Sequence, residues 1–331
     1  MNGWIASSSR LFNSLIGPPR NDIFDAMLKD RILSTLKFFD LQDYPVTLLE
    51  LHKFLVSDIN GVKDHLDENG EIKSFDIKPA PVSIDEVLMV LEQQCQNEVG
   101  NHLGFYYLAG RQAIAHSRLQ NYFYGIQREK LIKIYIGGLK YLPFVRGAAL
   151  AGSQAMGQEK PGSDIDLLII TAPGFLWLAR TLVTGYLQIL GKRRYGQNIA
   201  NRFCLNHYLA GAKSLQSDRN LYTACEYLKL RPLVFSHAVW QFQKNNANWI
   251  KFCFPNADFL EPEKDASPAL QKFLEKLFTG KFGFRLEGLL KNWQMARIRK
   301  QQFIVVEEDE LSFHPHNRKN KLFRAYFQDQ I

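Results

Sequence analysis

The chain has 331 residues, with 41 Lys and Arg against 33 Asp and Glu, a formal net charge of +8. Its composition, 46% hydrophobic and 22% charged, is typical of a soluble globular protein and excludes a low-complexity chain. Four widely spaced cysteines form no C-x-x-C pair, which argues against a zinc site or disulfide framework and predicts a cytoplasmic location.

The distribution of charge along the sequence is uneven. Residues 21–100 contain 7 Lys and Arg against 16 Asp and Glu, a net charge of −9, so the remainder carries +17. This asymmetry predicts an acidic domain over residues 21–111, with its boundary near Arg111, and a basic body after it. Residues 1–20 lack an apolar core long enough for a secretory signal and are predicted to form a disordered arm.

The acidic domain reads as three helices followed by a hairpin. Apolar spacing predicts a helix over Asp25–Leu41, and capping boxes at Thr47–Glu50 and Ser83–Glu86 open two more. Segments Glu98–Gly100 and Gly104–Leu108 then predict two short strands joined by a turn. This order resembles a winged helix-turn-helix.

A winged helix often binds DNA, but the third predicted helix, DEVLMVLEQQCQNE, contains no Lys or Arg. Acidic side chains facing phosphates would be repelled, because neutralising phosphates supplies most nucleic-acid affinity. We therefore predict a protein-interaction or packing module here, with a possible protein partner, and consider nucleic acid an unlikely ligand of this domain.

The middle of the chain alternates helices with buried strands. The expected elements are a helix over Gln120–Leu142 with Arg128 and its lysines exposed, strands over Val145–Ala151, Ile165–Thr171 and Arg202–Leu209, and a helix over Phe175–Leu190. The last helix holds the longest apolar stretch but includes Arg180, Thr181, Thr184 and Gln188. It is therefore too short and too polar for a bilayer span, and no membrane contact is predicted.

The junctions of these strands carry the most informative motif. The turn at Gly152-Ser153 ends the first strand, and its backbone N–H groups and hydroxyl could bind phosphate oxygens. Ser163, just before the second strand, is a further candidate for nucleotide binding. Asp164 and Asp166 begin the second strand and share one face, about 7 Å apart along the chain. Two carboxylates there are costly unless they share a cation, and oxygen ligands suit Mg²⁺ or Mn²⁺.

Gly-Ser, a short spacer and Ser-Asp-x-Asp between two apolar strands resemble the signature of the DNA polymerase beta-type nucleotidyltransferase superfamily, especially its small bacterial and archaeal members. The resemblance implies an α+β fold with a short mixed sheet, covering residues 112–212, and a helical region at 213–331 that closes over the nucleotide. It implies Asp164 and Asp166 as catalytic metal ligands, Gly152 and Ser153 as phosphate ligands, and an NTP as substrate.

The third strand departs from that pattern. In the family it usually supplies a third carboxylate, whereas RFCLNHYLA contains no acid. Strand alternation makes Asn206 the expected occupant and third metal ligand, with His207 directed away. An amide carries no charge, so either Asp164 and Asp166 hold one metal together with the triphosphate, or an acid from elsewhere, such as Glu226, joins them.

Basic residues follow the second strand. The basic turn Lys192–Arg194 and Arg202 are candidate phosphate ligands, with Lys192, Arg193 and Arg202 assigned to the nucleotide; a solvated helix end is the alternative interpretation of the turn. Farther on, Lys281–Phe303 predicts an amphipathic helix whose buried face comprises Leu286, Leu289, Leu290, Trp293 and Ile298.

Two functions follow from these residues. The first is an enzyme that transfers a nucleoside monophosphate from a Mg²⁺-bound NTP to an acceptor that the sequence does not identify. The second is a degenerate relative that binds nucleotide, or acts as a scaffold, without chemistry. Asn206 in place of a carboxylate is the feature that separates them.

Overall fold

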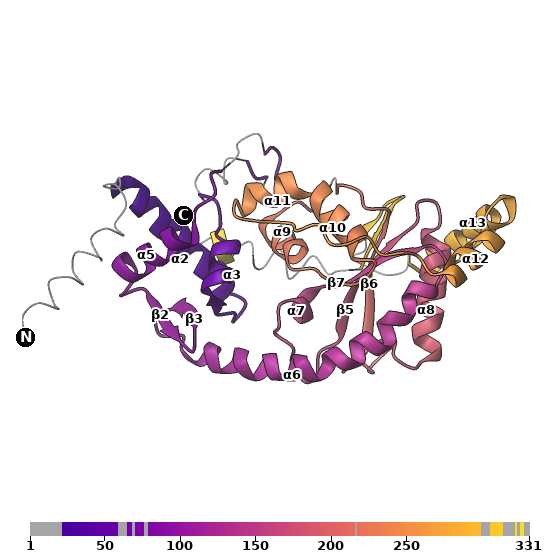
Figure 1. Cartoon of the computed structure of the whole chain (residues 1–331), viewed down its shortest axis with the longest axis horizontal. Coiled ribbons are helices and arrows are strands. Elements are labelled where there is room, and N and C mark those ends of the chain that lie inside the picture. Colours follow the sequence, from indigo (N-terminus) through magenta and orange to yellow (C-terminus); the bar gives the residue numbers. More distant parts are fainter. Residues whose placement is uncertain are drawn as a thin grey trace, which may run out of the picture.

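The computed structural model describes residues 22–58, 65–67, 70–75, 79–215, 217–298, 305–313, 322 and 325–327. The predicted arm over residues 1–20 lies outside them. The described chain is a mixed α+β structure with two small sheets, one of three and one of six strands. Figure 1 shows the helices of the acidic segment at one end and the larger sheet toward the other.

The acidic segment contains the predicted helices and hairpin. Helices α2 (Asp22–Asp40), α3 (Leu48–Lys53) and α5 (Ile84–Gln94) precede strands β2 (Val99–His102) and β3 (Phe105–Leu108). Both capping boxes are confirmed, because the Thr47 and Ser83 hydroxyls each accept a hydrogen bond from the third helical N–H, and the glutamate there returns one. A short strand that was not predicted, β1 (Val46–Thr47), pairs with β3 and completes the smaller sheet.

The next helix is long and connects the two regions. Helix α6 (Ala113–Ile136) begins seven residues earlier than predicted and is followed by a 3₁₀ turn, η1 (Gly137–Tyr141). It runs along the lower edge of the molecule from the hairpin to the larger sheet (Figure 1). The prediction that Arg128 is exposed is wrong, since the residue is 4% exposed. Its guanidinium donates to the carbonyls of Lys160, Pro161 and Ser163, which compensates for its burial.

The larger sheet positions the motif. Its order is β7-β4-β5-β6-β9-β8, where β4 (Val145–Leu150) is antiparallel to β5 (Ile165–Thr171) and β6 (Phe203–Ala210) is parallel to β5. These three strands agree with their predicted ranges to within one residue at each end. Helix α8 (Leu176–Ile189) links β5 to β6, as the crossover between parallel strands requires.

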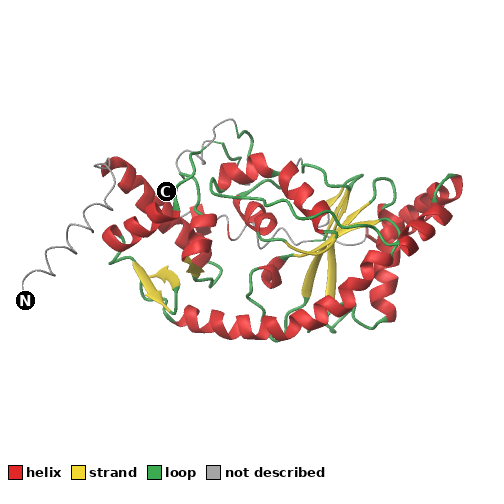
Figure 2. Cartoon of the chain, viewed as in Figure 1, coloured by secondary structure: helices red, strands yellow, loops and turns green. Residues whose placement is uncertain are grey.

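Both faces of the sheet are covered. Ile165, Leu167 and Ile169 of β5 pack with α6 and α8, whereas Leu168 and Ile170 face the opposite layer. That layer holds α9 (Leu221–Leu228), α10 (Ser236–Asn245) and α11 (Ala247–Cys253) (Figure 2). The strand is therefore a continuous apolar run, and any charged residue in it needs a specific partner.

The region after residue 213 is not purely helical, which corrects the predicted domain description. It contributes β7 (Arg231–Val234), β8 (Val305–Val306) and β9 (Glu310–Ser312) to the larger sheet. Strands of four, two and three residues are too short to produce a period-two signal in the sequence.

Helices α12 (Ala269–Phe278) and α13 (Lys281–Ile298) form a hairpin. The predicted helix from Lys281 is confirmed to Ile298, and residues 299–303 lie outside the described ranges. Its buried face is only partly as predicted, because Leu289 is 68% and Trp293 52% exposed. Gly283 and Gln294 are buried on this helix instead. The spacing of apolar residues alone therefore did not predict the buried face correctly. Within the described part of the chain, no helix combines the length and apolar character needed to cross a membrane.

One apolar cluster joins the acidic segment to the layer of α9–α11. It includes Leu28, Ile32 and Phe39 from α2 together with Trp249 and Phe254 from α11 and its C-cap. The ring of Phe254, fully buried, lies 5.7 Å from that of Phe54 and 6.5 Å from that of Phe38. The acidic segment therefore shares its core with the C-terminal half of the chain.

Replacing Phe254 with alanine should destabilise both regions together, because their common core loses a buried ring. We expect a loss of about 3–5 kcal/mol in the free energy of unfolding, measured by urea denaturation in a single transition. The control Phe273→Ala, at a residue that is 58% exposed, should change it by less than about 0.5 kcal/mol. Equal losses, or two transitions of which only one shifts, would contradict the shared core.

Candidate functional site

A cleft of about 370 Å³ opens where β5 begins, and it collects most of the motif. Gly152, Ser153, Ser163, Asp164 and Asp166 line it. Its other walls come from elements distant in sequence: Gln42 from the acidic segment, Cys204 and Asn206 from β6, Tyr222 and Glu226 from α9, and Phe313. The acidic segment and the C-terminal half thus both border the motif.

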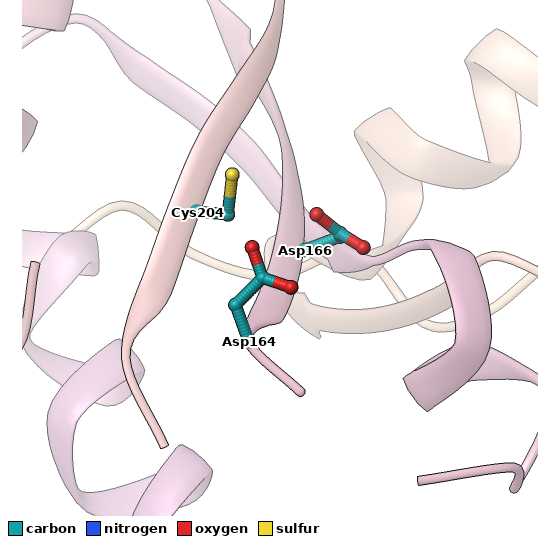
Figure 3. Close-up of side chains that lie close together, drawn as sticks. All are labelled: Asp164, Asp166 and Cys204. Atoms are coloured by element: carbon teal, nitrogen blue, oxygen red, sulfur yellow. The ribbon is translucent and has the colours of Figure 1, made fainter. Parts of the chain in front are cut away.

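The two carboxylates lie side by side with a thiol. Ligand atoms of Asp164, Asp166 and Cys204 are all within 4.8 Å of one another, and Figure 3 shows the three side chains together at the start of β5 and β6. Cys204 lies directly opposite Asp166 in the parallel pair, which explains its place in the group. Sequence reasoning missed Cys204, although its spacing of two from Asn206 was a signal that both could contact the same face.

Asn206 does lie beside the carboxylates. Its Nδ2 donates to Asp166 Oδ1 at 2.7 Å, and the residue is 7% exposed. The register of β5 and β6 shifts after Cys204, so that His207 lies opposite Leu168 and its Nε2 is 3.0 Å from Glu310 Oε1. Asn206 reaches Asp166 from within this irregular stretch, and His207 is engaged elsewhere.

The backbone of Gly152 lies close to the Asp166 carboxylate. A Cβ built at this position would be 2.6 Å from Asp166 Oδ2, and the backbone φ is +59°. Both the left-handed conformation and the close approach therefore require glycine. Gly152 and Ser153 begin a single helical turn, α7 (Gly152–Ala155), that follows β4 directly.

The loop before Asp164 is held by Arg128. The Arg128 Nη1 donates to Ser163 Oγ at 3.1 Å and the Nη2 to Ser163 O at 3.0 Å, while Ser163 Oγ donates to Lys160 O. The Ser163 hydroxyl lines the cleft but is used within this loop. Arg128, which the sequence analysis did not assign to the site, is thus a positioning residue for Asp164.

The predicted basic phosphate ligands separate in the structure. Lys192 Nζ lies 4.8 Å from the centre of the Tyr135 ring, and neither Lys192 nor Arg202 lines the cleft. Arg193 lines a neighbouring cavity. Arg194, from the same basic turn, is the residue that contacts the carboxylates. Its Nη1 lies 2.5 Å from Asp164 Oδ2 and 3.5 Å from Cys204 Sγ.

The electrostatics of the group are unbalanced at Asp166. Burial, then the negative charges of Asp164 and Glu226, raise the pKa of Asp166 to about 7, against the opposing effects of Arg194 and the Cys204 hydrogen bond. Burial and the two aspartates raise the pKa of the Cys204 thiol to about 12, so it is neutral near pH 7. A neutral thiol is a poor ligand for a hard cation.

The residues present fit a divalent cation with oxygen ligands. Asp164 and Asp166 supply two carboxylates, and Asn206 Oδ1 is a buried acceptor without a hydrogen-bond partner among the residues that the structure describes. Such an atom costs free energy unless something donates to it or coordinates it. Mg²⁺ and Mn²⁺ take this kind of ligand set, with water and phosphate oxygens completing it.

The acidic segment also contacts the turn that contains Gly152 and Ser153. The Tyr44 hydroxyl shares its one proton between two acceptors, Glu50 Oε1 at 2.6 Å and Met156 O at 2.9 Å, and Gln158 Nε2 donates to Asp43 O at 2.8 Å. Met156 is the C-cap residue of α7. The position of Gly152 and Ser153 is therefore tied to that segment.

A scan against protein-family models, a search of curated proteins and a search of solved structures each gave no significant match.

Substituting Gly152 with alanine should disrupt the site, because the new methyl group would displace the Asp166 carboxylate. We expect Gly152→Ala to weaken Mn²⁺ binding at least tenfold in calorimetry. Gly157→Ala is the matched control: its φ is also positive, at +69°, but a Cβ there meets nothing within 4 Å. Equal weakening in both variants would show that backbone strain, rather than contact with Asp166, is responsible.

The raised pKa of Asp166 predicts a pH dependence of stability in metal-free protein. Between about pH 4 and pH 7 the folded state keeps a proton on Asp166 that the unfolded chain releases, so stability falls as pH rises through this window. Asp166→Asn should remove this contribution and raise the melting temperature above pH 7 in EDTA. Thermal melts of both proteins from pH 4 to 8 give the difference; a difference that does not change with pH would contradict the assignment.

Proposed function

We propose that this protein is a Mg²⁺- or Mn²⁺-dependent nucleotidyltransferase of the DNA polymerase beta type, which transfers a nucleoside monophosphate from an NTP to an acceptor. The observation that carries the proposal is the contact between the Gly152 turn and the Asp166 carboxylate, at the mouth of a cleft. This close approach supports a shared site for a cation and the backbone N–H groups of the turn, the combination that binds a metal–triphosphate.

The order of elements supports the same family. A strand ending in Gly-Ser, a spacer, a strand beginning with Asp-x-Asp and a third neighbouring strand occur in one mixed sheet. The three helices and hairpin before them support a winged-helix-like module. Its net charge of −9 over residues 21–100 and its shared core favour packing or a protein partner over duplex DNA.

The proposed reaction is an in-line displacement at the α-phosphorus. An acceptor oxygen forms a bond to the α-phosphorus, the bond from that phosphorus to the bridging oxygen of the β-phosphate breaks, and pyrophosphate leaves. A hydroxyl acceptor gives its proton to water, while a phosphate acceptor has none to lose. When bound, the cation supplies charge neutralisation for the phosphoryl oxygens and the leaving group.

Each residue of the proposed site then has a defined role. Asp164 and Asp166 hold the cation, and Gly152 and Ser153 hold the triphosphate through backbone N–H groups and the hydroxyl. Arg194 neutralises Asp164 and is placed to meet a phosphate when the cation takes over that carboxylate. Asn206 fixes Asp166 Oδ1 and offers its own Oδ1 as a neutral ligand.

A second function has a specific observation in its favour. Asn206 stands where the family usually has an acid, and Arg194 already pairs with Asp164. Unless Glu226, which also lines the cleft, ligates a metal, the group holds less negative charge than a two-metal site requires. At an effective ε of about 20, one charge lost 4 Å from a unit positive charge is worth roughly 4 kcal/mol before solvation offsets it. This charge deficit favours a protein that binds nucleotide, or serves as a scaffold, without transferring it.

Transfer of label from the four α-³²P-labelled NTPs tests the proposal, with clarified cell extract as the acceptor source and Mg²⁺ or Mn²⁺ present. We expect label from at least one NTP in a new species, lost in the double variant Asp164→Asn/Asp166→Asn. Asp30→Asn, at an exposed site, should leave the yield unchanged. Metal-dependent NTP binding without transfer would favour the scaffold; no binding at all would contradict both functions.

Restoring a carboxylate separates the two functions further. Asn206→Asp should tighten metal binding and raise transfer roughly tenfold or more, a modest part of the Coulomb gain. Thermal melts with and without Mg²⁺ provide the check. If Asn206 is only a structural residue, the buried new charge should lower the melting temperature whether or not Mg²⁺ is present.

A further inference from the structure

A second cavity, of about 780 Å³, adjoins the cleft. The two share Arg194, Cys204, Asn206 and Phe313, so they meet beside the carboxylates. We name the second cavity the arginine pocket, because Arg180, Arg193, Arg194 and Arg297 all line it. Its walls are α8, the end of α13 and the turn over residues 193–196.

Three of the four arginines of this pocket have no counter-charge among the residues that the structure describes. No Asp or Glu is among the described residues that line it, and only Arg194 of the four arginines has an ion pair in the described part of the chain. Arg180 and Arg193 are close enough that the charge of Arg193 adds to burial in lowering the pKa of Arg180. Like charges brought together without a counter-charge indicate a site for an anion.

Arg180 is held in place for such a role. Its Nη1 donates to Gln294 Oε1, and Gln294 is 5% exposed and itself donates to Trp177 O and Thr181 Oγ1. The Arg180 Nε is buried without a hydrogen-bond partner among the described residues. The guanidinium is therefore positioned by α13, and its carbon lies 5.0 Å from the centre of the Phe313 ring, which also lines the pocket.

The rim of the pocket is aromatic. Trp293 and Tyr195 line it and are 52% and 70% exposed, and the guanidinium carbon of Arg297 lies 4.3 Å from the centre of the Trp293 ring. An exposed indole beside an arginine can stack on a planar or sugar-like group while the arginine binds a phosphate.

The position of the pocket identifies its occupant within the proposed reaction. Gly152 and Ser153, the triphosphate ligands, line only the cleft, whereas the arginine pocket meets it at Arg194, Cys204 and Asn206. In-line displacement brings the acceptor oxygen from the side opposite the leaving pyrophosphate. A cavity that joins the carboxylates away from the Gly-Ser turn is therefore suited to the acceptor.

We propose that the arginine pocket binds the acceptor, an inference that rests on the proposed function. The acceptor is then a phosphate-bearing organic molecule. Arg180, Arg193 and Arg297 bind its phosphate, and Trp293 contacts its organic part. The acceptor oxygen then reaches the α-phosphorus across Arg194 and Asn206. A neutral acceptor would leave three arginines without counter-charge.

Phenyl phosphate is a suitable probe, with phenol as its neutral analogue. Binding to the full chain is measured by ³¹P NMR line broadening and calorimetry in EDTA, so that no metal–nucleotide site contributes. We expect phenyl phosphate but not phenol to bind, and Arg180→Gln/Arg297→Gln to weaken it at least tenfold. Arg285→Gln removes an exposed arginine of the same helix, α13, and should leave the affinity unchanged.

Circular dichroism and Mg²⁺–NTP binding show whether the double variant is folded. Folded variant protein that binds phenyl phosphate as well as the wild type would overturn this inference, as would wild-type protein that does not bind the probe. Failure of the proposed function gives a different result: absence of NTP binding with every metal, whether or not the probe binds.

Discussion

The structure depends on keeping two carboxylates together at the start of a strand that is buried on both faces. Burial and the charge of Asp164 both oppose ionisation of Asp166 and raise its pKa to about 7. The surrounding contacts respond to that constraint: Arg194 pairs with Asp164, Asn206 donates to Asp166, and Gly152 leaves room for the carboxylate. A divalent cation would complete this compensation, which is the physical basis of the proposed function.

The fold supplies rigidity around that group from three directions. Arg128 on α6 fixes the loop that ends at Ser163. The acidic segment contacts the end of the α7 turn through the hydrogen bonds of Tyr44 to Met156 O and of Gln158 to Asp43 O. The sheet fixes the carboxylates themselves, since α8 and the α9–α11 layer cover its two faces. A site whose parts must hold to within about 0.5 Å gains from such independent supports.

Sequence patterns predicted the parts of the site that depend on local spacing. Gly152, Ser153, Asp164 and Asp166 lie where strand alternation and turn chemistry placed them, and both capping boxes formed. The missed features are tertiary: Cys204 joins the group through a parallel register, and Arg194 of the predicted basic turn pairs with the Asp164 carboxylate. Arg128 was predicted to be exposed because no local sequence pattern indicates its hydrogen bonds to the carbonyls of residues 160, 161 and 163.

Electron–nuclear spectroscopy of bound Mn²⁺ tests most directly whether Asp164 and Asp166 hold a cation that bridges to a triphosphate. With ATP or another NTP present, the account predicts a bound Mn²⁺ signal with ³¹P hyperfine coupling, because phosphate oxygens share the ion with the carboxylates. Asp164→Asn/Asp166→Asn should abolish both. A bound ion without ³¹P coupling, or a spectrum unchanged in the double variant, would contradict the proposed site.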